Sequence, residues 1–345
     1  MDKLCSRQSL TEAEYEALIA ARTPQLAAEL AARACKACEA VYGSAVYVRG
    51  LIEFSNQCDN NCLYCGIRRG NEACERYHLT TEEVLACARE GWDAGFRTFV
   101  LQSGESAAND EWVATTVRAL KQAFPKAAVT LSVGERPRAV YAQWRAAGAD
   151  RYLLRHETAT PAHYAQLHPA TMSWENRMAC LRALRAEGYA VGAGFMVGSP
   201  FQTPAHLAAD VKFVETFKPE MCGIGPFVPH SATPFRDYPA GSVDLTCYML
   251  SLVRLAHPGV LLPATTALEA LDADGRVKAL AAGANVVMPN ITPAAQQQRY
   301  TLYEGKPASA QTAAQKWAAL EEKLAPVGRH LAVDRGDSKK EAVHG

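Results

Sequence analysis

The sequence predicts an α/β fold, a complete (β/α)8 barrel of the TIM type with an N-terminal helical extension. Three observations predict it. From residue 50 onward, one unit recurs roughly every 30 residues, and it consists of a short apolar strand, a polar turn and an amphipathic helix. The strands are rich in Val, Ile and Leu, as expected of a parallel sheet buried on both faces. The unit occurs eight times, which favours a closed barrel over the alternative, an open doubly wound sheet.

The elements are expected in a simple order along the chain. Residues 1–48 are expected to form helices packed on the outside of the barrel, and residues 49–310 to form the barrel itself. Residues 311–345 are expected to form a C-terminal helix and a disordered tail, because the final stretch DRGDSKKEAVHG is polar. The eight expected strands are 50–55, 98–104, 128–134, 151–157, 190–198, 221–229, 260–267 and 284–290.

The helices between the strands carry start and stop signals. Thr81 and Asp244 are residues of the N-cap type, and Thr203 is followed by Pro204 at the first helical position. Several helices end at a glycine directly before the next strand, where glycine adopts the left-handed conformation without a Cβ clash. These glycines are Gly95, Gly148, Gly188 and Gly283.

Composition and charge exclude several classes of function. Lys+Arg and Asp+Glu both number 36, so no basic field predicts a nucleic-acid partner and no polybasic stretch predicts a membrane surface. The N-terminus lacks the pattern of a signal peptide, and no apolar run is long enough to span a bilayer. We therefore expect a cytoplasmic protein. Its eleven cysteines are then not a disulfide framework, and Cys35 and Cys38 are expected to pack within a helix.

Polar residues follow almost every expected strand, at the carboxyl rim where barrels of this kind carry their active sites. They are Gln102, Ser103, Gly104, Glu105, Thr130, Ser132, Arg155, His156, Glu157, Ser199, His230, Thr265, Thr266 and Asn290, with Met196 near the end of the fifth strand. Arg155 and Glu157 lie two apart on one strand and so share a face. Arg155 is equally consistent with structural pairing and with ligand contact, whereas ligand contact is favoured for Glu157. His156 faces the other way and is expected to pack against a helix.

The stretch SNQCDNNCLYC follows the first strand and holds Cys58, Cys62 and Cys65. A structural zinc site or a ferredoxin cluster takes four protein ligands, and nothing marks Cys74 as the fourth. Three cysteines on a 4Fe–4S cubane leave one iron open. The amine and carboxylate of S-adenosylmethionine (SAM) are suited to chelate that iron, and one electron into the sulfonium then releases a 5′-deoxyadenosyl radical. A closed barrel shields such a radical from water.

These cysteines, with Tyr64 before the last of them, resemble the signature of the radical SAM superfamily. Ser103-Gly104-Glu105 resembles the Gly-Gly-Glu element of that superfamily, which contacts the methionyl amine of SAM, although serine replaces the first glycine. Between residues 45 and 306 the chain is most similar to the HydE-type maturase of FeFe-hydrogenase. The similar stretches are FSNQCDNNCLYCGIRRGN, VLQSGE, TLSVGE, AGADRYLLRHETA, SWENRM, GAGFMVGSPFQT, GIGPFVPH, PATTA and GANVVMPN.

The resemblance implies residues for two ligands. SAM is held by positions matching Glu157 and Arg177, to which the rim pattern adds Met196. The cavity below SAM is lined by positions matching Gln102, Thr130, Arg155, Thr265, Thr266, Met288 and Tyr300, to which we add Ser132. The implied activity is assembly of the diiron subcluster of the hydrogenase, on a cysteine-bound iron carbonyl-cyanide species. The implied partners are a low-potential electron donor and other hydrogenase maturases.

Some relatives carry a second cysteine trio after the last strand. The matching stretch YEGKPASAQTAAQKW has none, so a single 4Fe–4S cluster is expected. The alternatives are a radical SAM enzyme like methylornithine synthase or biotin synthase, acting on an amino-acid-type substrate. Biotin synthase is disfavoured because it needs a second cluster inside the barrel and no strand here ends in cysteine. An electron carrier or a zinc module without chemistry of its own is disfavoured by the missing fourth cysteine.

Overall fold

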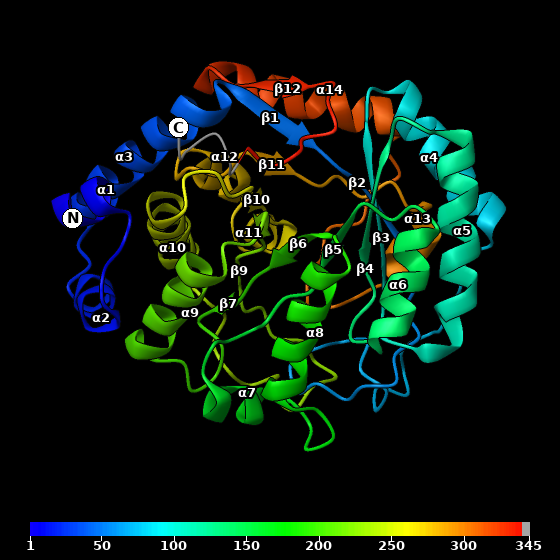
Figure 1. Cartoon of the computed structure of the whole chain (residues 1–345), viewed down its shortest axis with the longest axis horizontal. Coiled ribbons are helices and arrows are strands. Elements are labelled where there is room, and N and C mark those ends of the chain that lie inside the picture. Colours follow the sequence, from blue (N-terminus) through cyan, green and yellow to red (C-terminus); the bar gives the residue numbers. More distant parts are fainter. Residues whose placement is uncertain (340–345) are drawn as a thin grey trace.

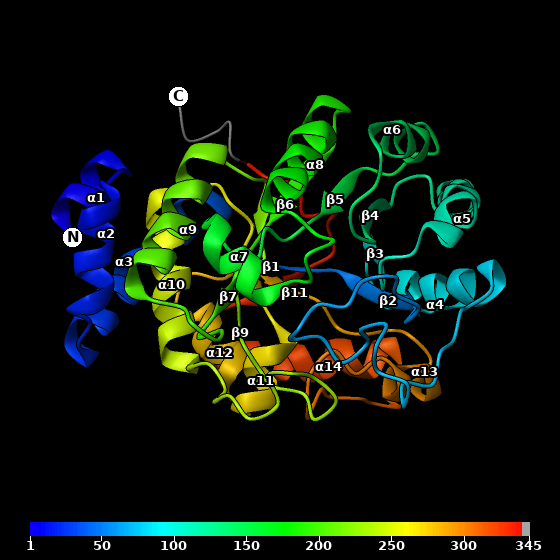
Figure 2. The same cartoon turned by 90° about the horizontal axis from the view of Figure 1, so that it is seen from below.

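The computed structural model describes residues 1–339, and its helices surround a set of central strands (Figures 1 and 2). The longer helices are α3 (Pro24–Tyr42), α4 (Thr81–Asp93), α5 (Asp110–Ala123), α6 (Arg138–Ala146), α8 (Trp174–Ala186), α9 (Pro204–Phe217), α10 (Val243–Ala256) and α14 (Ala313–Leu324). The shorter ones are α1 (Asp2–Arg7), α2 (Glu12–Ala20), α7 (Pro161–Leu167), α11 (Thr266–Leu271), α12 (Gly275–Leu280) and α13 (Ala294–Arg299). No helix within residues 1–339 is both long and apolar enough to cross a bilayer.

The strands are short, and neighbouring strands run parallel to one another. They are β1 (Ala45–Val48), β2 (Gly50–Ser55), β3 (Thr98–Ser103), β4 (Ala128–Ser132), β5 (Arg151–Leu153), β6 (Ala190–Ala193), β7 (Met196–Val197), β8 (Met221–Cys222), β9 (Gly225–Pro226), β10 (Pro263–Ala264), β11 (Val286–Val287) and β12 (His330–Ala332). A six-stranded sheet has the order β2-β3-β4-β5-β6-β8, and a four-stranded sheet has the order β10-β11-β1-β12. All the pairings between named strands are parallel, which confirms an α/β fold.

Two isolated bridges connect these sheets. Met221 in β8 bridges Leu261 in parallel, and the amide of Cys222 donates to the carbonyl of Leu261 at 2.9 Å. On the other side, Leu51 in β2 bridges Asn290, and the amide of Leu51 donates to the carbonyl of Pro289 at 3.0 Å. Each of the eight expected strand segments therefore contributes to the sheets or to one of these bridges.

The alternation of side chains along the strands separates an outer face from an inner one. Phe54 and Leu101 are buried in the large hydrophobic core that includes residues of the surrounding helices. Glu53, Gln102 and Ser132 lie in register across β2, β3 and β4, so they form one layer on the opposite, inner face. This layer lies near the carboxyl ends of the strands, from which the loop with the three rim cysteines departs.

The first 48 residues are helical, as expected, up to Tyr42. Helix α2 packs on α9, and α3 packs on α10, so the extension covers one side of the molecule (Figure 1). Residues 45–48 differ from the expectation, because they form β1 and pair with β11 and β12. Strand β1 lies between β11 and β12 and hydrogen-bonds to both. This pairing satisfies the backbone N–H and C=O groups of residues 45–48.

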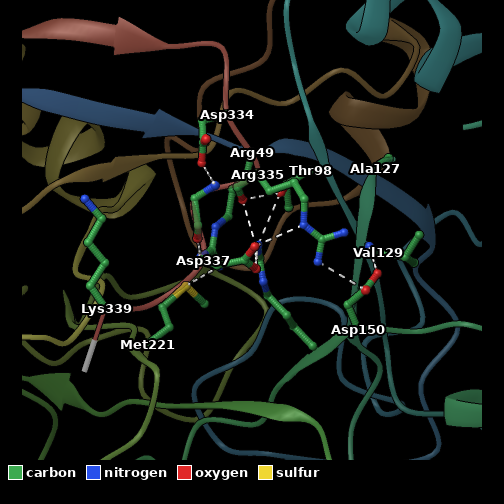
Figure 3. Close-up of polar contacts among 12 residues, drawn as sticks. Arg49, Thr98, Ala127, Val129, Asp150, Met221, Asp334, Arg335, Asp337 and Lys339 are labelled. Carbon is green, nitrogen blue, oxygen red and sulfur yellow. Dashed lines mark hydrogen bonds and ion pairs between the residues drawn. The ribbon is translucent and has the colours of Figure 1, made fainter. Parts of the chain in front are cut away.

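The end of the chain also differs from the expected disorder. Residues 334–339 lie against the amino ends of the strands, where Arg49, Arg335, Asp337 and Asp150 form a polar network (Figure 3). The expected tail beyond residue 339 lies outside the described residues. The polar sequence suggested a solvated tail, but its charges find buried partners that are distant along the chain.

Arg151 is the centre of these contacts and is nearly buried, at 5% exposure. Its Nη2 atom lies 2.5 Å from Oδ1 of Asp337 and donates to the carbonyl of Arg335 at 2.8 Å. Arg335 in turn donates from Nε to Oδ2 of Asp337 at 3.0 Å. A buried guanidinium needs a counter-charge, and the tail supplies it.

Candidate active site

The loop after β2 holds the three rim cysteines against the loop after β3. The amide of Asp59 donates to the carbonyl of Glu105 at 2.7 Å, and the amide of Gly104 donates to the carbonyl of Ser55 at 3.0 Å. A Cβ on Gly104 would lie 2.3 Å from the carbonyl oxygen of Gln57 and 2.8 Å from Cβ of Cys58. Only glycine permits this close approach, so Gly104 sets the distance between the two loops.

Cys58, Cys62 and Cys65 are all partly buried free thiols. Burial raises the pKa of all three, and that of Cys65 reaches about 12. The sulfur of Cys74 accepts from Nδ2 of Asn56 at 3.6 Å. Three thiols from one loop are the ligand type that iron–sulfur clusters take, so the residues fit a cluster with one open iron.

Among residues 1–339, no three His, Cys, Asp or Glu side chains converge on a point suited to a single metal ion. A cubane does not require such a point, because each cysteine ligates a different iron.

Arg177 is nearly buried and lies among acidic and phenolic side chains. Its Nε atom lies 2.6 Å from Oε1 of Glu135, and its Nη1 donates to the carbonyl of Arg155 at 3.3 Å. Burial alone would lower the pKa of Arg177, but Tyr164, Glu135 and Glu105 raise it well above its ordinary value. The guanidinium therefore stays charged and is available to an anionic ligand group.

Glu105 occupies the space beside Gly134, where a Cβ would lie 2.1 Å from Oε2 of the glutamate. Burial raises the pKa of Glu105, and Arg177 opposes that shift. The hydroxyl of Ser103, by contrast, donates to the carbonyl of Gly104 at 2.6 Å and is not directed to another partner. Within the predicted Ser103-Gly104-Glu105 element, the carboxylate of Glu105 is the group that faces Arg177.

Glu157 is the end of the fourth strand segment and has an unusual backbone. Its φ angle is +64°, which is rare for a residue with a side chain. The amide of Glu157 donates to the carbonyl of Gly194 at 3.0 Å, and its carbonyl accepts from Met196 at 3.3 Å. Such strain persists where the surroundings fix it, and it often marks a functional position.

Arg155 lies beside Glu157, as the sequence predicted. Nη2 of Arg155 is 3.1 Å from Oε2 of Glu157, but the atoms are not aligned for a hydrogen bond. His156 points outward and its Nε2 lies 3.3 Å from Oδ1 of Asp210 in α9, which agrees with its expected packing against a helix. Both pairs leave hydrogen-bonding capacity unused, because Nε2 of His156 also lacks a hydrogen-bond partner among residues 1–339.

Tyr64 and Met196 contribute an apolar wall. Both belong to one cluster with Leu63, Leu167, Phe227 and Phe235. The hydroxyl of Tyr64 lies 3.1 Å from Nε2 of His168, whose Nδ1 is 2.9 Å from the carbonyl of Tyr164. Since Nδ1 carries the proton toward that carbonyl, Nε2 accepts from Tyr64.

The other predicted residues lie deeper on the inner face. Tyr300 is buried, which raises the pKa of its phenol, and the nearby side chain of Gln102 opposes that shift. The hydroxyl of Thr266 lies 2.8 Å from that of Tyr303, and Thr265 donates to the carbonyl of Ile224 at 3.5 Å. Met288 packs against the interior cluster that includes Leu153, Met221 and Leu261.

Thr130 lies apart from these residues. It lines a small cavity of about 10 Å³ with Arg49, Arg151 and Met221, close to the C-terminal tail. Ser132, two residues further along β4, shares the layer of Gln102. The two β4 residues therefore face the same interior at different depths. A larger cavity of about 320 Å³, lined by residues of α4, α13 and α14, contains none of the predicted site residues.

Sequence reasoning missed one charged residue of the inner layer. Glu53 is fully buried and pairs in register with Gln102. Its Oε2 accepts from Nζ of Lys306 at 2.8 Å and from Nδ2 of Asn290 at 2.7 Å. The available signal was a glutamate in the middle of the apolar strand GLIEFS, since buried carboxylates are rare unless paired.

Comparisons with known proteins identify the family of the chain. A model described as the radical SAM superfamily matches residues 52–214. The chain is 47% identical over 265 residues to the FeFe hydrogenase maturase subunit HydE of Thermotoga maritima, which covers 76% of this chain and 75% of that protein. It is 26% identical over 306 residues to 3-methylornithine synthase of Methanosarcina barkeri, covering 88% of this chain and 86% of that one.

Among solved structures, that of methylornithine synthase superimposes with a TM-score of 0.85 at 25% identity, covering 96% of both chains. This similarity supports the α/β fold over nearly the whole length. The superfamily match includes the cysteine loop, Arg155, Glu157 and Arg177, and the identity to the maturase confirms the resemblance predicted from the motifs. The chain belongs to the radical SAM superfamily and, within it, to the family of the FeFe hydrogenase maturase subunit HydE.

Proposed function

We propose that this protein is a radical SAM enzyme of FeFe-hydrogenase maturation. The observation that carries the proposal is the set of three rim thiols without a fourth, beside the charged cluster of Glu105, Glu157 and Arg177. The 47% identity to the HydE maturase supports the maturation role. A cytoplasmic location stays a prediction.

Cys58, Cys62 and Cys65 would hold one 4Fe–4S cluster, and the neighbouring residues would hold SAM. When bound, the cluster and SAM would supply a 5′-deoxyadenosyl radical by one-electron cleavage of SAM. Arg177 and the acidic groups would bind the charged ends of SAM, and Tyr64 and Met196 would cover its apolar surface. The assigned SAM residues are Tyr64, Ser103, Gly104, Glu105, Glu157, Arg177 and Met196.

The inner face below this level would hold the substrate. Arg155 offers donor groups without aligned partners, which suits an anionic or carboxylate-bearing ligand. The proposed substrate is a small organometallic or amino-acid-like molecule, and the proposed partners are a low-potential electron donor and the other maturases. The assigned substrate residues are Gln102, Thr130, Ser132, Arg155, Thr265, Thr266, Met288 and Tyr300.

The fold that would enclose this chemistry is a closed (β/α)8 barrel spanning residues 49–310. The two isolated bridges, at Leu261 and at Asn290, support closure because they lie where the six-stranded sheet meets β10 and β11. Closure would exclude water from the radical. The helices up to Tyr42 and the described residues 311–339 would then lie outside the barrel.

Anaerobic reconstitution tests the reaction. With SAM and dithionite, the reconstituted chain is expected to form 5′-deoxyadenosine, whereas Cys62→Ala is expected to form none. Iron analysis is expected to give about four atoms per chain, because a cubane takes cysteine ligands and the chain has one trio. Failure of the wild-type chain to cleave SAM would exclude a radical SAM enzyme, and roughly eight iron atoms would contradict a single cluster.

A methylornithine-synthase-like reaction is the second candidate, supported by the similarity over 96% of the chain. The same assay distinguishes it if each of the common amino acids is added in turn. Stimulation of 5′-deoxyadenosine formation by a free amino acid would favour this candidate. Stimulation only by an iron-bound cysteine species would favour maturation.

A further inference from the structure

Glu53 is a fully buried carboxylate on the inner face of β2, next to the candidate substrate residue Gln102. Burial raises its pKa, and Lys306 and Asn290 oppose that shift. The second oxygen, Oε1, has no hydrogen-bond partner within the described part of the chain. Burying a carboxylate here reduces the stability of the fold. We therefore expect this position to serve a function.

The partner of Glu53 is distant in sequence. Lys306 reaches into the interior from the segment after α13, and its side chain is only 6% exposed. Its Nζ lies 2.8 Å from Oε2 of Glu53, while Asn290 holds the same oxygen from the end of the eighth strand segment. Three segments of the chain therefore meet at one carboxylate oxygen.

The segment 300–306 carries two phenols toward the candidate substrate residues. Nζ of Lys306 lies 5.1 Å from the centroid of the Tyr300 ring, which favours the ring in that place. Tyr300 meets Gln102, and Tyr303 meets Thr266 at 2.8 Å. Lys306 ends this segment, so the place of both phenols depends on where its side chain is fixed.

Further contacts hold the segment at other places: the hydroxyl of Ser231 donates to Oε2 of Glu304 at 3.0 Å, and Nε2 of His230 lies 3.4 Å from the hydroxyl of Thr301. The carbonyl of Leu302 accepts from Gly66 at 2.8 Å, and the amide of Glu304 donates to Pro229 at 3.0 Å. Gly305 has a φ of +68° and no neighbour within 4 Å of a Cβ built on it. The ion pair is thus the one buried side-chain anchor of this segment that reaches β2 among residues 1–339.

We propose that Glu53 and Lys306 are positioning residues, which fix Tyr300 and Tyr303 on the wall of the substrate space. The inference rests on the proposed function for the identity of that space. A buried ion pair with an additional hydrogen bond has one favoured geometry. It therefore fixes the position of the segment that carries Lys306. Neither residue is assigned to SAM or to the cluster.

Fluorine NMR of the full-length reconstituted protein tests the proposal. The chain is labelled with 3-fluorotyrosine, and Tyr300→Phe and Tyr303→Phe assign the two signals. In Lys306→Met, both signals are expected to shift by more than a linewidth, and Lys306→Arg is expected to restore them. Titration of the same samples with SAM is expected to change the Kd by less than about twofold, since the pair does not contact SAM.

Lys316→Met is the matched control. Lys316 is also partly buried, and its Nζ donates to the carbonyl of Asn290 at 2.6 Å, but it contacts neither tyrosine in the described structure. Its loss is expected to leave both signals in place. If both variants shift the two signals equally, the effect is general and the proposal is wrong.

Folding is checked by circular dichroism. If Lys306→Met does not fold, Glu53→Gln/Lys306→Met replaces it, because it leaves no charge buried, and Glu53→Gln serves as a near-isosteric third variant. If the Tyr300 and Tyr303 signals do not move in a folded variant that lacks Lys306, the proposal is wrong. Failure of wild-type SAM binding would instead contradict the proposed function, because the tyrosine signals do not depend on SAM.

Discussion

Nη2 of Arg155 lies 3.1 Å from Oε2 of Glu157, yet both atoms lack an aligned hydrogen-bond partner within residues 1–339. Both side chains are largely shielded, at 31% and 12% exposure. Unmet hydrogen-bonding capacity at a largely shielded charge is costly. We propose that a bound ligand uses the capacity of this pair.

The first prediction concerns SAM. Glu157→Gln and Arg177→Ala are expected to weaken SAM binding by about 10- to 100-fold, because each removes a charge-assisted hydrogen bond. The cluster is expected to remain, as judged by absorbance and iron content. Calorimetric titration under anaerobic conditions measures the binding. Arg138→Ala, which removes an exposed arginine paired with Glu187, is the control. Unchanged SAM affinity in both site variants would remove these residues from the SAM site.

The second prediction concerns the cluster. Cys62→Ala is expected to abolish it, because two thiolates do not retain a cubane that normally takes three or four. Cys74→Ala is expected to retain it, since the Cys74 sulfur is instead near the amide of Asn56. Iron analysis and the visible spectrum after reconstitution check both variants. Loss of the cluster in Cys74→Ala would make it a fourth ligand and would close the iron site to SAM.

The third prediction concerns pH. Burial lowers the pKa of His163 to about 4, assisted by His206 and opposed by the carbonyl of Pro200. The unfolded chain binds a proton at this histidine below about pH 6.5, whereas the folded chain does so only near pH 4. The free energy of unfolding therefore decreases as the pH falls from about 6.5 to about 4. His163 contributes about 1 kcal/mol of this decrease per pH unit.

His163→Gln is expected to flatten that slope between pH 6 and pH 5. Urea unfolding at several pH values measures it. Between pH 7.5 and 8.5 the free energy of unfolding is expected to depend on pH equally in wild type and His163→Gln. His163 is then neutral in both the folded and the unfolded state. An unchanged slope at acid pH would show that His163 is protonated in the folded protein.

The fourth prediction concerns the tail against the amino ends of the strands (Figure 3). Asp337→Ala removes the carboxylate 2.5 Å from the nearly buried Arg151. The Asp337 side chain is 60% exposed, so solvent screening limits the loss of unfolding free energy to about 1 kcal/mol. Thermal unfolding measures it. Asp237→Ala is the control, because Asp237 pairs only with exposed Arg236. Equal melting temperatures for wild type and Asp337→Ala would show that the tail contributes no stability through this contact.

Local sequence signals placed much of the fold and the rim. The strand from 50 to 55 and the helix from 81 were visible because alternation and capping are set by neighbouring residues. The cysteine loop was equally visible, because its three cysteines lie within eight positions of the sequence. The pairing of Arg155 with Glu157 followed from the period of a strand.

The remaining features depend on residues that are distant along the chain. The disorder predicted for the tail was wrong for residues 334–339, because polar composition does not reveal that Arg151 needs a counter-charge there. Glu53 was missed for the same reason, since its partner Lys306 is 253 positions away. Thr130 and Ser132 looked equivalent on one strand, and only the packing of the interior set them at different depths.

The sequence by itself determined the alternation of strands and helices, the three cysteines and the resemblance to radical SAM enzymes. Those properties depend on short-range periodicity and on side-chain chemistry, and both can be recognised from residues that are close together in the sequence. Only the tertiary structure decided which charges meet on the inner face and which meet at the amino ends of the strands. Electrostatic interactions act across space, so the partners of Arg151 and Glu53 were fixed by folding rather than by sequence neighbourhood.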